Sequence, residues 1–302
     1  MTEIKKFEVI IIGGSYSGLS AAMALGRSLR SVLVIDSGLP CNRQTPHSHN
    51  FITQDGEKPA VIAAKAKAEV SKYSTVEFLN GFAVAAEKTA YGFIISTAAG
   101  EKAEAKKLIF ATGIADKFPD IKGLQECWGI SVVHCPYCHG YELKGKKTGI
   151  LANGAKALHL ASLVNNLTQH ITIFTMGKKD FKEADMAKFE QHNIEIVEAE
   201  VSEIEHENGQ LSHLLLNDGT RIAYDALYAA VPFSQHSDLP MTLGCEITEH
   251  GYIAVDDFQK TTVTGIYACG DNSSMMRAVA NAVYRGNVAG ALVNKELTDE
   301  GF

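Results

Sequence analysis

Two cysteines separated by two residues, with a histidine directly after the second, form the stretch of this sequence best suited to chemistry. It reads His134-Cys135-Pro136-Tyr137-Cys138-His139-Gly140. Such a pair can close a small disulfide ring and thereby store and return two electrons. If Cys135 caps a helix whose first turn holds Pro136, the positive end of the helix dipole favours thiolate over thiol. The imidazole of His139 titrates near neutrality and could carry the proton of the leaving sulfur.

Three other interpretations fit the same stretch. Cys-x-x-Cys-His is the attachment signature of c-type haem, the spacing could furnish part of a zinc site, and buried cysteines are often inert. Residues 1–7 contain no apolar signal region, and no apolar run approaches the roughly 18–20 residues of a membrane span. This pattern predicts a cytoplasmic protein, where structural disulfides are rare and haem c is not attached. We therefore favour a redox pair and expect no metal.

The composition is that of a soluble globular protein. The chain has 302 residues, enough for two domains, of which 46% are hydrophobic and 21% charged. Its formal net charge of −7 offers no basic surface for nucleic acid or an anionic membrane. Neither is expected as a partner.

The elements that must position the pair begin with a nucleotide-binding pattern. A strand at 7–12 is followed by the turn Gly13-Gly14-Ser15-Tyr16-Ser17-Gly18, a helix over 19–30, and a strand at 32–36. This order is the βαβ dinucleotide fingerprint, in which Gly13 makes the tight turn and Gly18 lets helix and strand approach. Asp36 is placed to accept from a ribose hydroxyl. Ser15 replaces the second glycine and could donate to a diphosphate, while the alternative is a doubly wound sheet with an empty turn.

A polar loop rich in turn-forming residues follows at 37–50 and is interpreted as contacting a ligand. Arg43 could reach a phosphate, and Asn50 could bind a flavin edge. His47 and His49 are either surface residues or, for one of them, a neighbour of the redox centre. The cysteines outside the pair are assigned to packing: Cys41, Cys127, Cys245 and Cys269. Further elements expected before the pair are a helix over 59–73 and strands at 76–79, 82–86, 93–97 and 107–110, the last two antiparallel.

A second βαβ pattern follows the pair, with strands at 147–151 and 171–175 and a helix that ends near residue 167. Its fingerprint is eroded, because Ala152 replaces the first glycine. The second strand ends in Thr175-Met176-Gly177 rather than in an acid or paired arginines, and only lysines 178 and 179 are close. The fold is expected to persist here, whereas nicotinamide binding stays open.

The chain then returns to the first domain. A strand at 265–269 ends in Gly270-Asp271, where an acid suits a ribityl hydroxyl. A helix over 275–293, opened by Arg277 and Ala278, could point its N-terminus at a flavin carbonyl.

In this order the motifs resemble the low-molecular-weight thioredoxin reductase family of flavoproteins, nearly from end to end. They are the turn 13–18, the strand end Ala111-Thr112-Gly113, the cysteine pair, and 266–271 followed by Arg277-Ala278. The resemblance implies an α/β fold of two Rossmann-like, three-layer domains. Residues 1–113 and 246–302 would form an FAD-binding domain, and 114–245 an inserted pyridine-nucleotide-type domain that carries the dithiol. It also implies a homodimer and rotation of the inserted domain about hinges at 113–120 and 243–251.

Residue roles follow from the same resemblance. Cys138 would face the flavin, Cys135 would attack an external disulfide, and His139 stands where the family usually has an Asp acid/base. The implied cofactor-binding residues are Gly13, Gly14, Ser15, Gly18, Asp36, Ser37, Arg43, Asn50, Thr112, Gly113, Gly270, Asp271, Arg277 and Ala278. The histidine after the pair, Ser15 and the Pro-Cys-Asn-Arg loop look closer to a branch that contains small-molecule dithiol oxidases.

Three functions remain open from the sequence. A disulfide reductase would pass electrons from NAD(P)H through FAD and the pair to a thioredoxin-like protein or a small disulfide. A dithiol oxidase would run electrons from a dithiol to oxygen, and a flavin redox sensor would not turn over. We favour an FAD-dependent dithiol/disulfide oxidoreductase, with the direction of electron flow and the use of NAD(P)H open.

Overall fold

The computed structural model describes residues 4–302 and divides into two compact α/β units. The first unit holds the chain up to Arg43, residues 51–115 and residues 234–302, and the second holds residues 44–50 and 116–233. Within residues 4–302, no helix is long and apolar enough to cross a membrane.

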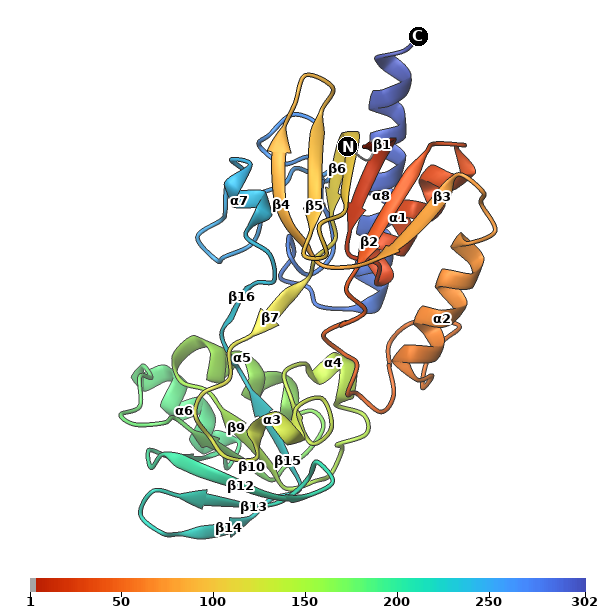
Figure 1. The fold of residues 1–302 in the computed structure, drawn as a ribbon. Coiled ribbons are helices and arrows are strands. Elements are labelled where there is room, and N and C mark those ends of the chain that lie inside the picture. The colour runs from red at the N-terminus through yellow and green to blue at the C-terminus, as the bar shows by residue number, and fades with distance from the viewer. Residues whose placement is uncertain (1–3) are drawn as a thin grey trace. The chain divides into compact units, whose positions relative to one another are not determined.

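The first unit is built on a seven-stranded sheet with the order β3-β2-β1-β6-β5-β4, in which β17 also pairs with β6 (Figure 1). Its strands are β1 (Lys5–Ile12), β2 (Val32–Asp36), β3 (Val76–Asn80), β4 (Ala83–Lys88), β5 (Phe93–Thr97), β6 (Lys102–Phe110) and β17 (Ile266–Ala268). Its helices are α1 (Tyr16–Arg27), α2 (Pro59–Val70), α7 (Leu239–Thr242) and α8 (Val279–Asp299). The sequence of β1, turn, α1 and β2 is the predicted βαβ unit.

Strand β6 is shared by three neighbours. It runs parallel to β1 along most of its length, antiparallel to β5 over residues 102–105, and parallel to β17 over 108–110. The predicted antiparallel set is confirmed for β5 and β6, but residues 93–96 of β5 pair with residues 102–105 of β6, whereas 107–110 pair in parallel with β1 and β17. Residues 107–110 are all buried, as is typical of the interior of a parallel sheet with both faces covered.

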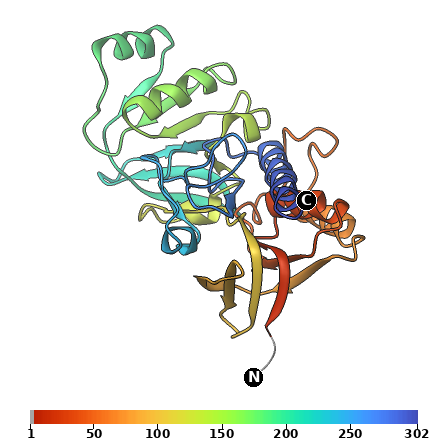
Figure 2. The same ribbon diagram turned by 90° about the horizontal axis from the view of Figure 1, so that it is seen from above.

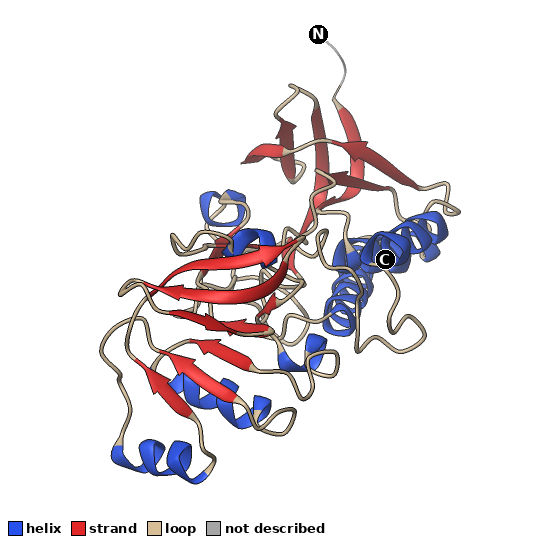
Figure 3. Cartoon of the chain, turned by 90° about the horizontal axis from the view of Figure 1, so that it is seen from below, coloured by secondary structure: helices blue, strands red, loops and turns tan. Residues whose placement is uncertain are grey.

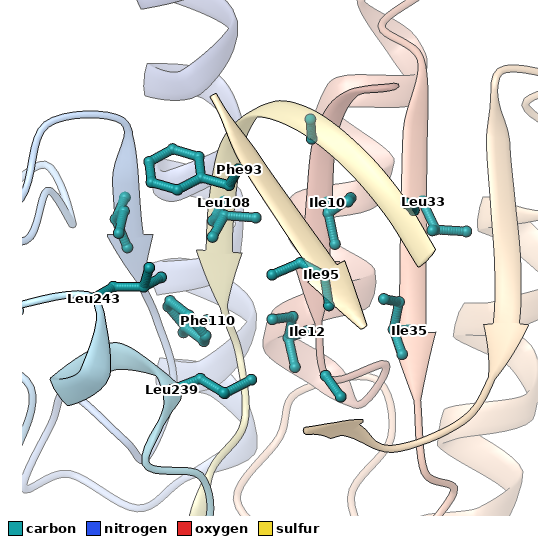
Figure 4. Packing of buried hydrophobic residues seen from close by; sticks show 14 of the residues in the cluster. Ile10, Ile12, Leu33, Ile35, Phe93, Ile95, Leu108, Phe110, Leu239 and Leu243 are labelled. Carbon is teal, nitrogen blue, oxygen red and sulfur yellow. The ribbon is translucent and has the colours of Figure 1, made fainter. Parts of the chain in front are cut away.

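Alternating side chains of β1 enter two separate cores. Ile10 and Ile12 pack with side chains of β2, β5 and α7 on one face (Figure 4). Val9 and Ile11 pack on the other face with α1 and α8. A strand with both faces covered explains the unbroken apolar run in the sequence.

Helices α1 and α8 pack side by side (Figure 2). A Cβ on Gly286 would lie 2.0 Å from the carbonyl oxygen of Ser17, and one on Gly290 would lie 2.5 Å from that of Ala21. Only glycine permits this approach. The last helix begins later than the predicted residue 275, because Asn281 donates from Nδ2 to the carbonyl of Met276 at 2.8 Å and to the hydroxyl of Ser274 at 3.1 Å, holding these residues in a loop.

The second unit has a five-stranded parallel sheet with the order β11-β10-β9-β15-β8. Its strands are β8 (Val132–Val133), β9 (Thr148–Leu151), β10 (Ile171–Phe174), β11 (Glu195–Val197) and β15 (Ala226–Ala229). A three-stranded sheet of β12 (Val201–Glu207), β13 (Gln210–Leu216) and β14 (Arg221–Ala223) packs on one face. Helices α5 (Gly154–Val164) and α6 (Glu183–Gln191) cover the other (Figure 3). Two single-turn helices complete the unit, α3 (Leu124–Cys127) and α4 (Pro136–His139).

The chain passes between the units through β7 (Ile114–Asp116) and β16 (Phe233–Gln235), which form a two-stranded sheet. The second crossing differs from the predicted boundary at 245/246, since it lies at 233/234. The physical reason is that Leu239 and Leu243 pack into the core of the first unit (Figure 4). Of the two implied hinges, 113–120 contains a crossing and 243–251 does not.

Candidate active site

The two cysteines lie at the start and in the middle of α4. Cys135 is the N-cap of this turn, with extended backbone (φ −123°, ψ 113°), and Pro136 occupies its first position. The amides of Cys138 and His139 both donate to the carbonyl of Cys135 at 3.3 Å. Cys135 thus occupies the predicted N-cap position, although its side chain makes no capping hydrogen bond. The two Sγ atoms lie 2.8 Å from one another. Both cysteines are only partly buried.

His139 is set up to be neutral near pH 7. Burial lowers its pKa, the nearby His49 lowers it further, and Glu142 opposes both effects. Glu142 Oε1 also lies 3.6 Å from Nδ1 of His49. A neutral imidazole accepts a proton, which is the task expected of a base beside a dithiol. His49 is thus the loop histidine that lies near the pair, while His47 is exposed with its ring centre 6.4 Å from that of His49.

The remaining cysteines differ in kind from the pair. Cys127, Cys245 and Cys269 are buried, and burial raises the pKa of Cys127 to about 11 and that of Cys269 to about 12. Such thiols are poor nucleophiles. Cys41 is exposed, which corrects its assignment to packing. Among residues 4–302, no group of three or more His, Cys, Asp and Glu side chains could hold a metal ion.

The first glycine turn is built for close approach. A Cβ on Gly18 would lie 1.8 Å from the carbonyl oxygen of Gly13, and one on Gly13 would lie 2.2 Å from that of Ala111. Ser15 is the N-cap of α1, yet its side chain makes no capping hydrogen bond. Asp36 accepts from the amide of Gly14 at 3.0 Å through Oδ1, so it braces the turn in addition to any contact with a ribose.

A cavity of about 280 Å³ opens over this turn. Of the predicted cofactor-binding residues it is lined by Gly13, Gly14, Ser15, Asp36, Ser37 and Thr112. Its lining also includes Lys67 of α2, which the sequence did not single out. A glycine cradle with a serine and a lysine at its rim fits a diphosphate of a dinucleotide.

The other predicted residues lie outside the lining of this cavity. Gly18 and Gly270 serve packing around α1, since a Cβ on Gly270 would meet Oγ of Ser17 at 2.6 Å. Arg43 is exposed and donates to the carbonyl of Pro40. Asn50 is exposed and groups with the second unit. Gly113 directly follows Thr112 and has a positive φ of +66°. Oδ2 of Asp271 lies 3.9 Å from Nε of Arg277. Ala278 occupies the N-cap position of α8.

Two side-chain amide oxygens of the first unit are buried without a hydrogen-bond partner among residues 4–302. They are Oδ1 of Asn272 and Oε1 of Gln235. Asn272 is fully buried and donates from Nδ2 to Oγ1 of Thr112, which lines the cavity. Buried polar atoms are nearly always satisfied, so orphaned acceptors beside a cavity fit a site for a polar ligand with donor groups.

In the second unit, the turn between β9 and α5 is held by hydrogen bonds of the Asn153 side chain. The amide of Asn153 accepts from the N–H groups of Gly154 and Asp180, each at 2.9 Å, and donates to the carbonyl of Lys178 at 2.9 Å. A Cβ on Gly154 would meet Oδ2 of Asp180 at 3.6 Å, which places a carboxylate near the N-terminus of α5. In a dinucleotide-binding turn this position receives the pyrophosphate.

Comparisons with known proteins agree on one family. Residues 7–286 match the model for pyridine nucleotide-disulphide oxidoreductases. The chain is similar to thioredoxin reductase tcpT of Claviceps purpurea, with 35% identity over 96% of this chain and 94% of that one. It is also similar in structure to an oxidoreductase from Agrobacterium tumefaciens (36% identity, TM-score 0.91, 97% and 99% of the two chains).

A putative thioredoxin reductase TrxB from Bacillus anthracis has 30% identity and a TM-score of 0.93, and the match covers 98% of this chain and all of that one. These likenesses confirm the predicted fold class of two Rossmann-like domains and a thioredoxin reductase-like oxidoreductase. The chain belongs to the pyridine nucleotide-disulphide oxidoreductase family.

Proposed function

We propose that this enzyme is an FAD-dependent dithiol/disulfide oxidoreductase that exchanges electrons between the flavin, the Cys135/Cys138 pair and an external dithiol or disulfide. The pair itself carries the proposal, because its sulfur atoms lie 2.8 Å apart at the start of a helical turn beside a neutral histidine. The external partner is a thioredoxin-like protein or a small molecule. A homodimer and a cytoplasmic location are part of the same proposal.

FAD, held over the turn at Gly13 and the cavity beside it, would take up or release two electrons. An external dithiol is oxidised as follows. One of its thiolates attacks Sγ of Cys135, and Cys138 leaves as a thiolate. The second external thiolate then closes the product disulfide, and Cys135 leaves. The pair then holds the two electrons and two protons as two thiols, from which FAD would take the electrons, and His139 can hold one of the protons. Reduction of an external disulfide is the reverse.

Anaerobic titration of the purified yellow protein tests this function. We expect dithiothreitol to bleach the flavin in the wild type and in the buried-thiol control Cys245→Ser. In Cys138→Ser we expect turnover between dithiol and disulfide to fall by at least about 10³-fold, as for loss of a nucleophile that acts as part of a unit. Full turnover in Cys138→Ser, or a colourless protein that takes up no flavin, would refute the proposal.

One observation favours electron flow from the external dithiol to the flavin, as in a dithiol oxidase. The hydrogen bonds of Asn153 and the carboxylate of Asp180 occupy the turn that would hold the pyrophosphate of a nicotinamide cofactor. Electrons would then run from the dithiol through the pair and the flavin to oxygen. Stopped-flow mixing decides between the directions. An oxidase is expected to stay yellow with millimolar NADPH or NADH and to bleach with a dithiol. Rapid bleaching by either nicotinamide supports the reductase instead.

A further inference from the structure

Tyr228 presents a buried hydroxyl with no hydrogen-bond partner within the second unit. The residue is 1% exposed, and its hydroxyl is one of the few buried side-chain oxygens without a partner among residues 4–302. A buried tyrosine hydroxyl normally has a hydrogen-bond partner, so a buried hydroxyl without one is unusual and points to a functional role.

The register of the sheet directs Tyr228 toward the cysteine pair. Tyr228 of β15 is paired with Val133 of β8, and both side chains lie in the core on the α5 face. The chain continues from Val133 through one residue to Cys135, the N-cap of α4. His134, which lies between them, stacks on Trp128 of the core on the opposite face, so Cys135 is placed on the side of Val133 and Tyr228. Helix α4 in turn contacts α5, whose side chains in this core are apolar.

The electrostatics agree with this placement. Burial raises the pKa of Tyr228, and the negative forms of Cys135 and Glu142 raise it further. The hydroxyl is therefore a neutral donor near pH 7. The other titratable groups on α4 are Cys138, whose Sγ lies 2.8 Å from that of Cys135, and His139, which in turn interacts with His49 of the loop.

We propose that the hydroxyl of Tyr228 donates a hydrogen bond to the thiolate of Cys135 when the pair is reduced, and so stabilises that sulfur as leaving group and nucleophile. A neutral disulfide sulfur is a weak acceptor, whereas a thiolate is a strong one, so the bond forms with the charge. No bond is made or broken at Tyr228 and no proton leaves it. The inference rests on the redox role proposed for the pair.

The test measures the thiolate directly. In the reduced holoenzyme, brief pulses of iodoacetamide over a range of pH, with fragment mass spectrometry to locate the label, give the alkylation profile of Cys135. Because a lost hydrogen bond to a charged acceptor raises the thiol pKa, we expect the midpoint in Tyr228→Phe to rise by about one pH unit. At a pH below both midpoints, alkylation then slows by about tenfold.

Tyr224→Phe is the matched control. Tyr224 is also a buried tyrosine of this unit, but it packs on the opposite face of the sheet and its hydroxyl is bonded to Thr172. We expect it to leave the Cys135 profile unchanged and to lower thermal stability. Tyr228→Phe should not lower thermal stability, because the hydroxyl it removes has no partner.

An unchanged midpoint in Tyr228→Phe overturns the inference, as does an equal shift in Tyr224→Phe. Alkylation does not depend on turnover, so failure of the proposed function and failure of this inference are told apart. A protein without dithiol turnover can still show the shift, and an active enzyme can lack it.

Discussion

Lys107 and Glu296 form an ion pair inside the first unit, with Nζ of the lysine 2.6 Å from a carboxylate oxygen. The Lys107 side chain is only 6% exposed and also contacts Glu300. Glu296 accepts in addition from Lys260 at 2.7 Å and from the hydroxyl of Tyr267 at 2.6 Å. This cluster links β6, through Lys107, and β17, through Tyr267, to helix α8, which carries Glu296.

Lys107→Met is expected to lower the free energy of unfolding by about 1–3 kcal/mol, because it leaves partly buried carboxylates without their nearest cation. The measurement is the urea midpoint followed by circular dichroism. Lys295→Met is the control, because Lys295 lies on α8 beside Glu296 but pairs with Asp299 at the surface, where 67% of the Lys295 side chain is exposed. We expect it to cost no more than about 1 kcal/mol. Equal losses in the two variants would contradict the importance of the buried pair.

The same cluster makes stability depend on pH. Burial alone would raise the pKa of Glu296, but hydrogen bonds from Lys107, Lys260 and Tyr267 outweigh it and hold the pKa at about 2. A carboxylate with a lowered pKa stabilises the fold at pH values above its ordinary pKa near 4.5. It loses that contribution as the pH falls from 4.5 toward 2. Glu296→Gln should therefore be less stable than the wild type at pH 7, and the difference should shrink below pH 4.5. The exposed control Glu249→Gln should follow the wild type throughout, and a constant difference for Glu296→Gln would contradict this account.

The sequence pattern predicts those structural elements whose formation depends on residues that are neighbours in the chain. The βαβ unit at the N-terminus and the N-cap position of Cys135 at α4 depend on apolar runs, glycines and a proline that are neighbours in the chain. The start of α8 could not be predicted, because the hydrogen bonds of Asn281 keep the preceding residues out of the helix.

Side-chain direction likewise depends on tertiary packing. Lys67 is one of several lysines on α2, and only the packed structure shows that it lines the cavity. Glu142 and Tyr228 are far apart in sequence and come together around the pair. Asp36 is predicted from the sequence to accept from a ribose hydroxyl, and the structure adds that its carboxylate accepts from the backbone amide of Gly14.

The glycine turn can be tested by adding a single methyl group. Gly18→Ala should displace the turn, since the new Cβ would lie 1.8 Å from a backbone oxygen that cannot move freely. We expect flavin affinity to fall at least about tenfold, which corresponds to about 1.4 kcal/mol of binding. The readout is the ratio of flavin to protein after dialysis. Gly81→Ala is the matched control, because Gly81 lines the same cavity and its Cβ would meet only side-chain atoms of Thr97 and Glu101, the nearest at 3.5 Å. Retention of flavin by Gly18→Ala would show that the turn does not hold the cofactor.

Two neighbours of His139 act on its pKa in opposite directions. His49 lowers this pKa and Glu142 raises it. If His139 must be neutral to accept a proton, kcat/KM rises with pH through its pKa. His49→Gln removes the repelling charge, so the acid limb should move to higher pH, by about half a unit. Glu142→Gln removes the attracting charge, so the limb should move to lower pH by a similar amount.

The pH profile of dithiol oxidation checks both variants, with His250→Gln as a control because that side chain is 60% exposed and lies in the other unit. Opposite shifts of the two limbs identify His139 as the titrating base, since a general loss of structure would lower the rate at every pH. Shifts in the same direction would assign the limb to another group. If His139→Gln retains the acid limb of the wild type, the histidine is not the base at all.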